Sequence, residues 1–383
     1  MKGSEILVYL DNAATTKPCE QACEAVMKGL ETFGNPSSLH RAGLEAELLV
    51  SEARECVADA LGCSADEIYF TSGATESNNT AVFGAFKAQG KRKHRAVTTT
   101  VEHPAVAKPF DELEKLGCEV IRVSPDESGR FSAKDIFDAV NDDTFLVSAM
   151  LVNNETGAVL PVQKAFSMIK KKYPSVITHC DCVQGFMKTH VSVKKLCADM
   201  ISVSGHKIYA PKGIGALYIR KGLYIPAYLL GGGQEKGMRS GTESVPLICG
   251  FGAAVKMLKD NIPANLAKVR ELESYLFEKC RENGEITVNY SGEDKLPYVN
   301  SISVKDLKSE VLLHFLEERE VYVSSGSACS KGKKSGVLQE FKIPARDLDT
   351  TIRVSFSVNS QKSDVDAFIA AVEEAQKKLA RLR

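Results

Sequence analysis

Along the first two thirds of the chain, stretches in which apolar residues recur with the period of a helix alternate with short apolar runs typical of buried strands. Over residues 44–61 apolar side chains recur every three or four positions and Gly62 follows, which is typical of a helix and its stop signal. Short apolar runs separate this helix from later helical stretches, as expected of buried strands. The pattern predicts strands over 67–70, 96–101, 118–123, 145–152, 176–181, 200–203 and 213–219, and helices over 44–61, 74–88, 104–116, 132–140 and 162–172. Strands that alternate with helices indicate an α/β fold whose mostly parallel sheet is covered on both faces.

The pattern changes after about residue 260. Three helices are expected, over 264–282, 308–319 and 364–380, with Ser363 as the cap of the last. Short strand-like pieces lie between them, near 286–290, 298–304 and 321–323. This mixture favours a smaller α+β domain that begins near Pro263.

Charge and composition narrow the class of protein. The 383 residues hold 49 basic and 49 acidic side chains, so no broad basic surface for nucleic acid is expected. No apolar run reaches the roughly 20 residues that span a bilayer, and the N-terminus lacks the features of a signal peptide. The 11 cysteines are odd in number and irregular in spacing, which favours reduced thiols in the cytoplasm over disulfides or a metal site. We therefore expect a cytoplasmic protein without membrane or nucleic-acid partners.

Two polar residues follow buried strands, where ligands bind in such sheets. Lys207 follows the strand at 200–203 through the small residues Ser204 and Gly205, and a lysine at this place can form a Schiff base with a carbonyl cofactor. Asp181 ends the strand at 176–181, and a buried carboxylate there needs a cationic partner such as a protonated ring nitrogen. Gln184 is near enough to reach a ring oxygen. A surface lysine and a helix-capping aspartate are the ordinary alternatives.

An anion site is indicated at residues 70–77, Phe-Thr-Ser-Gly-Ala-Thr-Glu-Ser, where a strand, a glycine turn and a helix start follow in order. The free N–H groups of a helix start bind anions. The stretch lacks the lysine and glycine spacing of a nucleotide-triphosphate loop, so a single phosphate ester fits better. A plain capped helix is the alternative.

For three further residues the sequence permits both a functional and a purely structural role. His103 follows a strand and could stack on a flat ring and move protons, or be structural. Arg353 lies inside an apolar strand and could bind a substrate carboxylate or form a structural ion pair. Cys329 lies in a stretch rich in Gly, Ser and Lys, which is typical of a mobile surface loop whose lysines lower a thiol pKa. An incidental surface cysteine is the alternative.

These motifs together resemble the cysteine desulfurases of the NifS/IscS type, in the class V aminotransferase family of fold-type I enzymes that use pyridoxal 5'-phosphate (PLP). The resemblance extends over nearly the whole chain. It rests on LDNAATT (10–16), GNPSSLHRAG (34–43), FTSGATESNN (70–79), TTVEHPAV (99–106), NNETG (153–157), DCVQ (181–184), SGHKIYAPKGIGALY (204–218), GGGQEKGMRSGTE (231–243), SSGSACS (324–330) and IRVSFS (352–357).

The resemblance implies a role for each matching residue. Lys207 would hold PLP covalently, Asp181 would pair with the ring nitrogen, Gln184 with the ring oxygen, and His103 would stack on the ring and act in catalysis. Asn154 would contact the cofactor and, with Arg353, the substrate carboxylate. The phosphate would be held by Ala74, Thr75, Ser204 and His206, with Thr242 reaching in from the partner of a homodimer.

The implied activity is conversion of L-cysteine to L-alanine, with the sulfur held as a persulfide on Cys329 and passed to an acceptor protein. The implied fold is a large PLP-binding domain (15–260) with a seven-stranded sheet, and a small α+β domain (1–14 and 261–383) that carries the cysteine loop (324–336). Iron–sulfur scaffolds, tRNA thiolation proteins and dedicated assembly factors are all open as acceptors. Alternatives are a selenocysteine lyase or another C–S lyase, a class V transaminase, and a PLP-binding scaffold without turnover.

Overall fold

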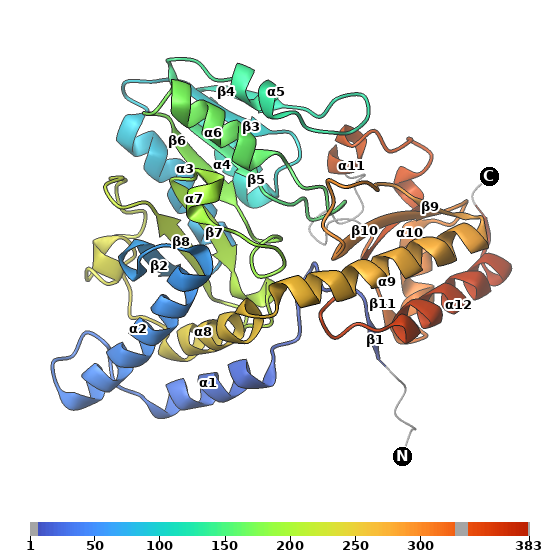
Figure 1. Cartoon of the computed structure of the whole chain (residues 1–383), viewed down its shortest axis with the longest axis horizontal. Coiled ribbons are helices and arrows are strands. Elements are labelled where there is room, and N and C mark those ends of the chain that lie inside the picture. Colours follow the sequence, from blue (N-terminus) through green and yellow to red (C-terminus); the bar gives the residue numbers. More distant parts are fainter. Residues whose placement is uncertain (1–6, 326–335, 382–383) are drawn as a thin grey trace.

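The computed structural model describes residues 7–325 and 336–381, which form a larger and a smaller part lying side by side (Figure 1). The larger part contains a seven-stranded sheet, and the smaller part contains a three-stranded sheet. None of the helices in the described ranges combines the length and apolar character that crossing a membrane requires.

The seven-stranded sheet is mostly parallel, as the sequence predicts. Its strands, in spatial order, are β2 (Ile68–Thr71), β8 (Gly215–Ile219), β7 (Met200–Ser204), β6 (Ile177–Asp181), β5 (Thr144–Met150), β3 (Arg95–Thr99) and β4 (Glu119–Val123). Only β8 runs against its neighbours among these strands, antiparallel to both β2 and β7. Every residue of β5, β6, β7 and β8 is buried, because helices cover both faces of the sheet.

Alternate residues of the strands enter two separate cores. Leu146, Met200 and Leu217 pack with the helices α3 (Ala74–Gln89) and α4 (Pro104–Lys115) on one face. Their neighbours along the strands pack on the other face. That second face is covered by α2 (Arg41–Leu61), α6 (Val162–Lys172) and α8 (Val245–Lys259), while α1 (Glu20–Glu31) packs on α8 and the short helices α5 (Ala133–Asp138) and α7 (Val193–Leu196) lie near α6.

The smaller part begins with the long helix α9 (Ile262–Asn283). Its antiparallel sheet has the order β12 (Thr351–Ser355), β10 (Val299–Val304) and β9 (Ile286–Val288). The helices α10 (Ser309–Glu317) and α12 (Lys362–Lys378) pack with α9 on this sheet, and α11 (Gly336–Glu340) lies toward the larger part (Figure 1).

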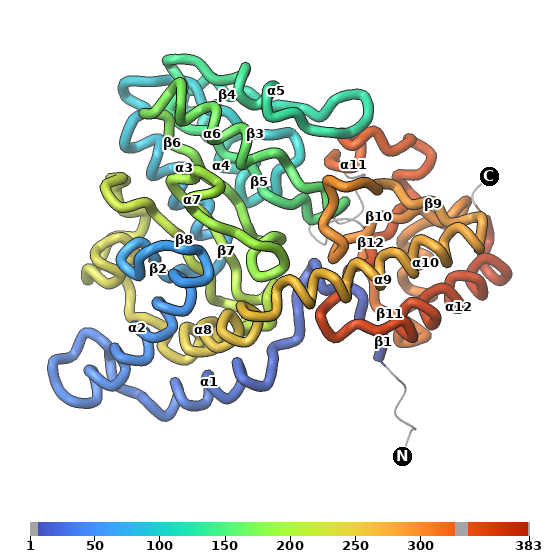
Figure 2. Tube along the Cα trace, viewed as in Figure 1, coloured from blue at the N-terminus to red at the C-terminus, as the bar shows by residue number. Residues whose placement is uncertain are grey.

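Residues near the N-terminus belong spatially with the C-terminal region. The strand β1 (Val8–Tyr9) pairs in parallel with β11 (Val321–Tyr322), and Asp11 bridges to Ser355. The tube in Figure 2 shows this N-terminal segment passing the red C-terminal strands before it enters the larger part. Residues 11–16 are thereby held between the two parts.

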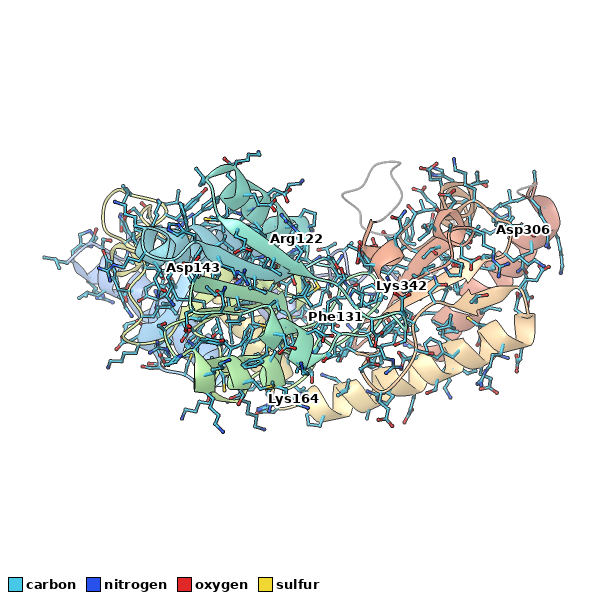
Figure 3. All side chains as sticks on the ribbon, turned by 90° about the horizontal axis from the view of Figure 1, so that it is seen from above. Arg122, Phe131, Asp143, Lys164, Asp306 and Lys342 are labelled. Atoms are coloured by element: carbon cyan, nitrogen blue, oxygen red, sulfur yellow. The ribbon has the colours of Figure 1, made fainter. Side chains whose placement is uncertain are left out.

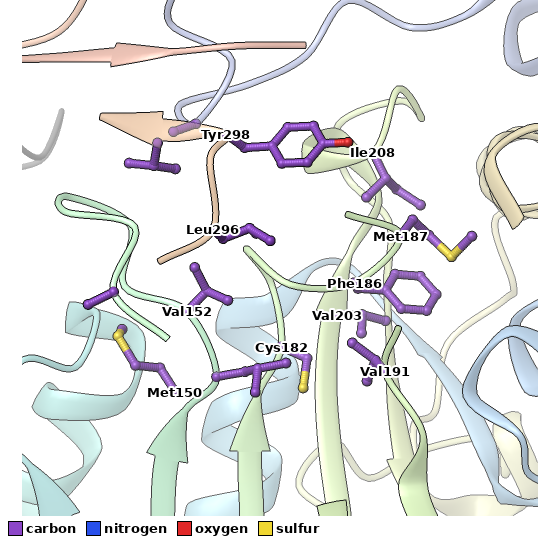
Figure 4. Close-up of a cluster of buried hydrophobic side chains, with 14 of the residues drawn as sticks. Met150, Val152, Cys182, Phe186, Met187, Val191, Val203, Ile208, Leu296 and Tyr298 are labelled. Carbon is purple, nitrogen blue, oxygen red and sulfur yellow. The ribbon is translucent and has the colours of Figure 1, made fainter. Parts of the chain in front are cut away.

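Aromatic and aliphatic contacts join the two parts. Phe131 packs edge-on against Phe341, with ring centroids 6.3 Å apart. Seen from above, Phe131 and Lys342 lie between the sheet side marked by Asp143 and the far end marked by Asp306 (Figure 3). A second contact lies at the strand ends, where Leu296 and Tyr298 meet a buried cluster of side chains that follow β5, β6 and β7 (Figure 4).

The periodic segments were predicted well and the aperiodic ones were not. The helix α8 is apolar on nearly all sides, so it lacks the stripe that reveals a helix. The helix α1 was also missed, although its apolar residues lie on one face. The prediction that Ser363 caps the last helix was wrong. Gln361 is the N-cap, and its backbone N–H donates to Asp364 Oδ2 in the first turn of the helix (2.9 Å).

Candidate active site

The carboxyl ends of β2, β5, β6 and β7 border a cavity of about 580 Å³ that also reaches β12. Ligands bind at this edge of a parallel sheet because the loops that follow the strands diverge there. The lining includes Ala74, Thr75, His103, Asn154, Asp181, Gln184, Ser204, His206, Lys207 and Arg353. The structure thus brings these predicted site residues together.

Two predicted site residues are not among those that line the cavity. Thr242 is exposed on the segment after the short turn Glu235–Gly237. Cys329 lies outside the described residues. The last residues described before it are close to the site, since Ser324 exchanges two backbone hydrogen bonds with Arg353 (N···O distances of 2.6 and 3.2 Å).

Lys207 lies in a single 3₁₀ turn, Gly205–Lys207, directly after β7. Its Nζ donates to the backbone carbonyls of Ala13 (2.7 Å) and Ala14 (2.6 Å). The segment that is held between the two parts of the molecule therefore fixes the position of the amine at the cavity.

Asp181 ends β6 with 6% of its surface exposed. One oxygen accepts from the backbone N–H of Val183 (3.0 Å) and the other from Asn78 Nδ2 (2.8 Å). Asn78 comes from the second turn of α3, and its Oδ1 is buried without a partner in the described part of the chain. These bonds orient the carboxylate and leave lone pairs for a further donor, such as a protonated ring nitrogen.

The start of α3 is arranged as an anion site. Gly73 is its N-cap and has a φ of 151°, which only glycine adopts readily, and no side chain caps the helix. The first N–H groups of a helix have no partners within the helix, so those of Ala74 and Thr75 are available to an anion. Ser204 and His206 line the same cavity.

The two cavity histidines are neutral near pH 7. Burial, together with the charges of Lys207 and Lys212, lowers the pKa of His206 to about 4. Burial also lowers the pKa of His103, against the effect of Asp181 and together with that of Lys207. His103 Nδ1 accepts from the N–H of Ala105 (3.1 Å) and so carries no proton, which leaves the ring proton on Nε2.

Arg353 is 3% exposed in β12 and makes two polar contacts that orient it. Nη1 donates to the backbone carbonyl of Asn154 (2.9 Å) and Nη2 to Asp11 Oδ1 (2.9 Å). Its Nε is buried and lacks a partner within the described residues. The arginine therefore forms the structural ion pair that was one of the two predictions, and it also keeps donors for a second carboxylate.

Glu102 is a buried carboxyl beside this site. Its Oε1 accepts from Thr99 Oγ1 (2.6 Å) and from the N–H of Met150 (2.9 Å). Burial, opposed by these bonds and assisted by the charge of Asp181, raises the pKa of Glu102 to about 8. Glu102 is therefore mostly protonated at neutral pH.

Sequence reasoning missed the partners of the predicted residues. Asn78 and Asp11 were inside the quoted motifs, but no role was given to them. Polar side chains on the buried face of a helix were the available signal for Asn78, which is fully buried with Ser77. Nothing local marks Asp11 as the partner of Arg353, because 342 positions separate them.

The chain belongs to the aminotransferase class-V family, since the model of that family matches residues 8–368. It is 39% identical over 377 residues to a protein of Dictyoglomus turgidum named cysteine desulfurase IscS, with 97% of this chain and 95% of that protein covered. A solved NifS-like protein has a TM-score of 0.92 at 35% identity and covers 98% of this chain and 100% of its own. A second, SspA in complex with cysteine, has a TM-score of 0.80 at 33% identity, with 91% and 98% covered.

The residues present fit PLP, the cofactor of this family. A cavity-lining amine, a buried carboxylate with open lone pairs, a helix start without a side-chain cap and a neutral imidazole line one space. They match in turn the aldehyde, ring nitrogen, phosphate and ring face of the cofactor.

Proposed function

We propose that the protein is a PLP-dependent cysteine desulfurase that converts L-cysteine to L-alanine and keeps the sulfur as a persulfide on Cys329. Apart from membership of the family, one observation on this chain supports the proposal. The segment that leads to Cys329 is paired through backbone hydrogen bonds with Arg353, the candidate binder of the substrate carboxylate. The relatives named cysteine desulfurase support the same reaction.

In this proposal the cofactor is bound through Lys207 and Asp181. Gln184 contacts its ring oxygen, His103 stacks on its ring, and Ala74, Thr75, Ser204 and His206 hold its phosphate. When bound, PLP supplies an electron sink for the charge that develops on the substrate Cα. The proposal is supported by the lining of the cavity and by the hydrogen bonds that orient Asp181.

Arg353 and Asn154 hold the substrate carboxylate. The guanidinium is oriented by Asp11 before substrate arrives, so little freedom is lost on binding. Lys207 Nζ is the group placed to move the proton of the substrate Cα, and neutral His103 can donate its Nε2 proton. The same proposal assigns catalytic roles to Lys207, His103 and Cys329.

Cys329 Sγ completes the reaction as the nucleophile. It forms a bond to the substrate sulfur while the bond from that sulfur to Cβ breaks. The electron pair of the broken bond returns to the carbon frame, which gains a proton and leaves as alanine. The sulfur stays on Cys329 as a persulfide for an acceptor in iron–sulfur cluster assembly or tRNA thiolation.

The short stretch of chain between Ser325 and Cys329, and the properties of the other cysteines, support this role for Cys329. Cys329 follows Ser325 by four positions, and four residue steps span at most about 14 Å when extended. None of the described residues that line the cavity is a cysteine. Burial raises the pKa of Cys63 and of Cys280 to about 12, which makes both poor nucleophiles at neutral pH.

Substituting Cys329 tests the proposal. The Cys329→Ser variant should bind PLP but form no alanine from L-cysteine and release no sulfide in the presence of a reductant. Cys23→Ser is a matched control, because Cys23 is an exposed thiol outside the cavity lining, and it should keep full activity. Alanine formation by Cys329→Ser at the wild-type rate would exclude the proposed role.

We further propose that the protein acts as a homodimer in the cytoplasm, with Thr242 completing the phosphate site of the partner. Large apolar side chains exposed on α1, on α2 and in residues 33–39 and 224–230 support an interface, since a monomer rarely leaves so many exposed. They are Met27, Leu30, Phe33, Leu39, Leu44, Leu48, Tyr224, Tyr228, Leu229 and Leu230. Sedimentation equilibrium should give twice the chain mass.

A location in the cytoplasm is supported by the ten described cysteines, because all of them are free thiols.

The proposed domain division follows the sheets. Residues 15–260 would form the PLP-binding domain, and residues 1–14 with 261–383 the smaller domain. Pairing of β1 with β11, and the start of α9 at Ile262 with proline in its first turn, support these boundaries.

A further inference from the structure

Lys188 is buried beside the candidate site, with 5% of its surface exposed. Its Nζ donates to Gln184 Oε1 at 2.8 Å and lies 5.7 Å from the centroid of the Tyr298 ring. Tyr298 belongs to the buried cluster where the smaller part meets the strand ends (Figure 4). The ammonium is therefore held between an amide oxygen and an aromatic face.

The backbone holds this side chain inward at a conformational cost. Lys188 lies in a turn after β6 in which its N–H donates to Gly185 (3.1 Å), and Met187 has a φ of 59°. Non-glycine residues seldom adopt such a φ, and they keep it where the surroundings demand it. The turn thus commits a lysine to a place where its charge is poorly solvated.

No ion pair offsets that burial within the described residues. The other deeply buried lysine, Lys295, is paired with Glu273 and also donates to Asn300 Oδ1 (2.8 Å). Among the residues that the structure describes, the Lys188 ammonium contacts the amide oxygen of Gln184 and the Tyr298 ring. Burial, with the charges of Lys207 and Arg353, lowers the pKa of Lys188 to about 7. Stability alone does not explain a lysine in this position.

The hydrogen bonds of Gln184 show what the lysine does. Gln184 is 4% exposed and lines the cavity, and its Nε2 donates to the carbonyl of Ala13 at 2.9 Å. Lys188 Nζ donates to the amide oxygen and the Ala13 carbonyl only accepts, so the two partners together define one orientation of the amide. The remaining Nε2 hydrogen is then the amide group available to a ligand.

We propose that Lys188 is a positioning residue that fixes the Gln184 amide so that it offers an N–H, and not a carbonyl, to the ring oxygen of the bound cofactor. This inference rests on the proposed function. An N–H donor stabilises the ionised ring oxygen, whereas a flipped amide would place a carbonyl against it. Ala13 accepts from both Gln184 and Lys207, so the same carbonyl aligns the amide and the reactive amine.

A double-mutant cycle on the PLP-loaded protein tests the inference. The readout is the pH midpoint of the visible absorbance change of the bound cofactor, which requires no turnover. Lys188→Met keeps an unbranched apolar stem without a donor and should raise the midpoint by about one pH unit, because the donor to the ionised oxygen is lost. Gln184→Leu should raise it at least as much.

The double variant separates positioning from a simple effect of charge. If Lys188 acts through the amide, Lys188→Met should cause no further shift in the Gln184→Leu background. A full shift in that background, or no shift in the presence of Gln184, overturns the inference. Lys188→Leu takes the place of the methionine variant if the latter does not fold.

Failure of this inference is distinguishable from failure of the proposed function. A wild-type protein that acquires no visible absorbance with PLP would contradict the proposed function itself. The wild-type protein could instead bind PLP and form alanine from cysteine, while Lys188→Met shifts the pH midpoint equally in the wild-type and the Gln184→Leu backgrounds. This outcome would contradict only the role of Lys188.

Discussion

Replacing Arg353 with lysine should reduce kcat/KM for L-cysteine by roughly 10- to 150-fold. The substitution keeps the positive charge but removes the planar fork, in which Nη1 and Nη2 each donate to Asn154 or Asp11 and each keep a second hydrogen for a substrate carboxylate. A hydrogen bond to a charged group contributes about 1.5–3 kcal/mol, and about 1.4 kcal/mol corresponds to a factor of ten. Loss of one such bond gives the stated range.

Cysteamine provides the matched substrate for this prediction, because it is cysteine without the carboxylate. Its binding to the PLP-loaded protein is measured from the change in visible absorbance. Wild type and Arg353→Lys should bind cysteamine with similar affinity, while their kcat/KM values for cysteine differ. An equal loss for both compounds would mean that Arg353 supports the fold, and an unchanged kcat/KM for cysteine would remove it from substrate binding.

Two further predictions concern the lysine that binds the cofactor and a buried acid. Lys207→Ala should lose the visible absorbance that PLP gives with the wild-type protein, and its persistence would contradict the assignment of the amine. Glu102→Gln should change how stability depends on pH, because burial raises the folded pKa of Glu102 to about 8 above an unfolded value of about 4.3. Wild type loses stability as pH rises through this window, so Tm of the variant minus Tm of wild type should increase from pH 5 to pH 8; a constant difference would refute the shift.

The seven-stranded sheet and the position of the site could be predicted from the sequence. Both depend on local patterns: alternating helices and strands define the sheet, and polar residues directly after strands mark its functional edge. Asp181 and Lys207 are such residues, and the structure places both at the same cavity. The helix α8 was not predicted because it is apolar on nearly all sides and so lacks an apolar stripe.

The partners of the site residues could not be predicted, since they depend on contacts between distant segments. Asp11 meets Arg353 only after β1 has paired with β11, and Asn78 reaches Asp181 only after α3 has packed on the sheet. Lys188 is close to Gln184 in sequence, but a turn with a positive φ at Met187 sets their contact. Sequence periodicity has no signal for such a turn.

Detection of sulfur on Cys329 tests directly whether this residue carries the persulfide. The PLP-loaded protein is incubated with L-cysteine, its thiols are trapped with an alkylating reagent, and its peptides are analysed by mass spectrometry. The peptide that contains Cys329 should carry the mass of one additional sulfur atom, and the peptide that contains Cys23 should carry none. Alanine formation without any added sulfur on Cys329 would contradict this role.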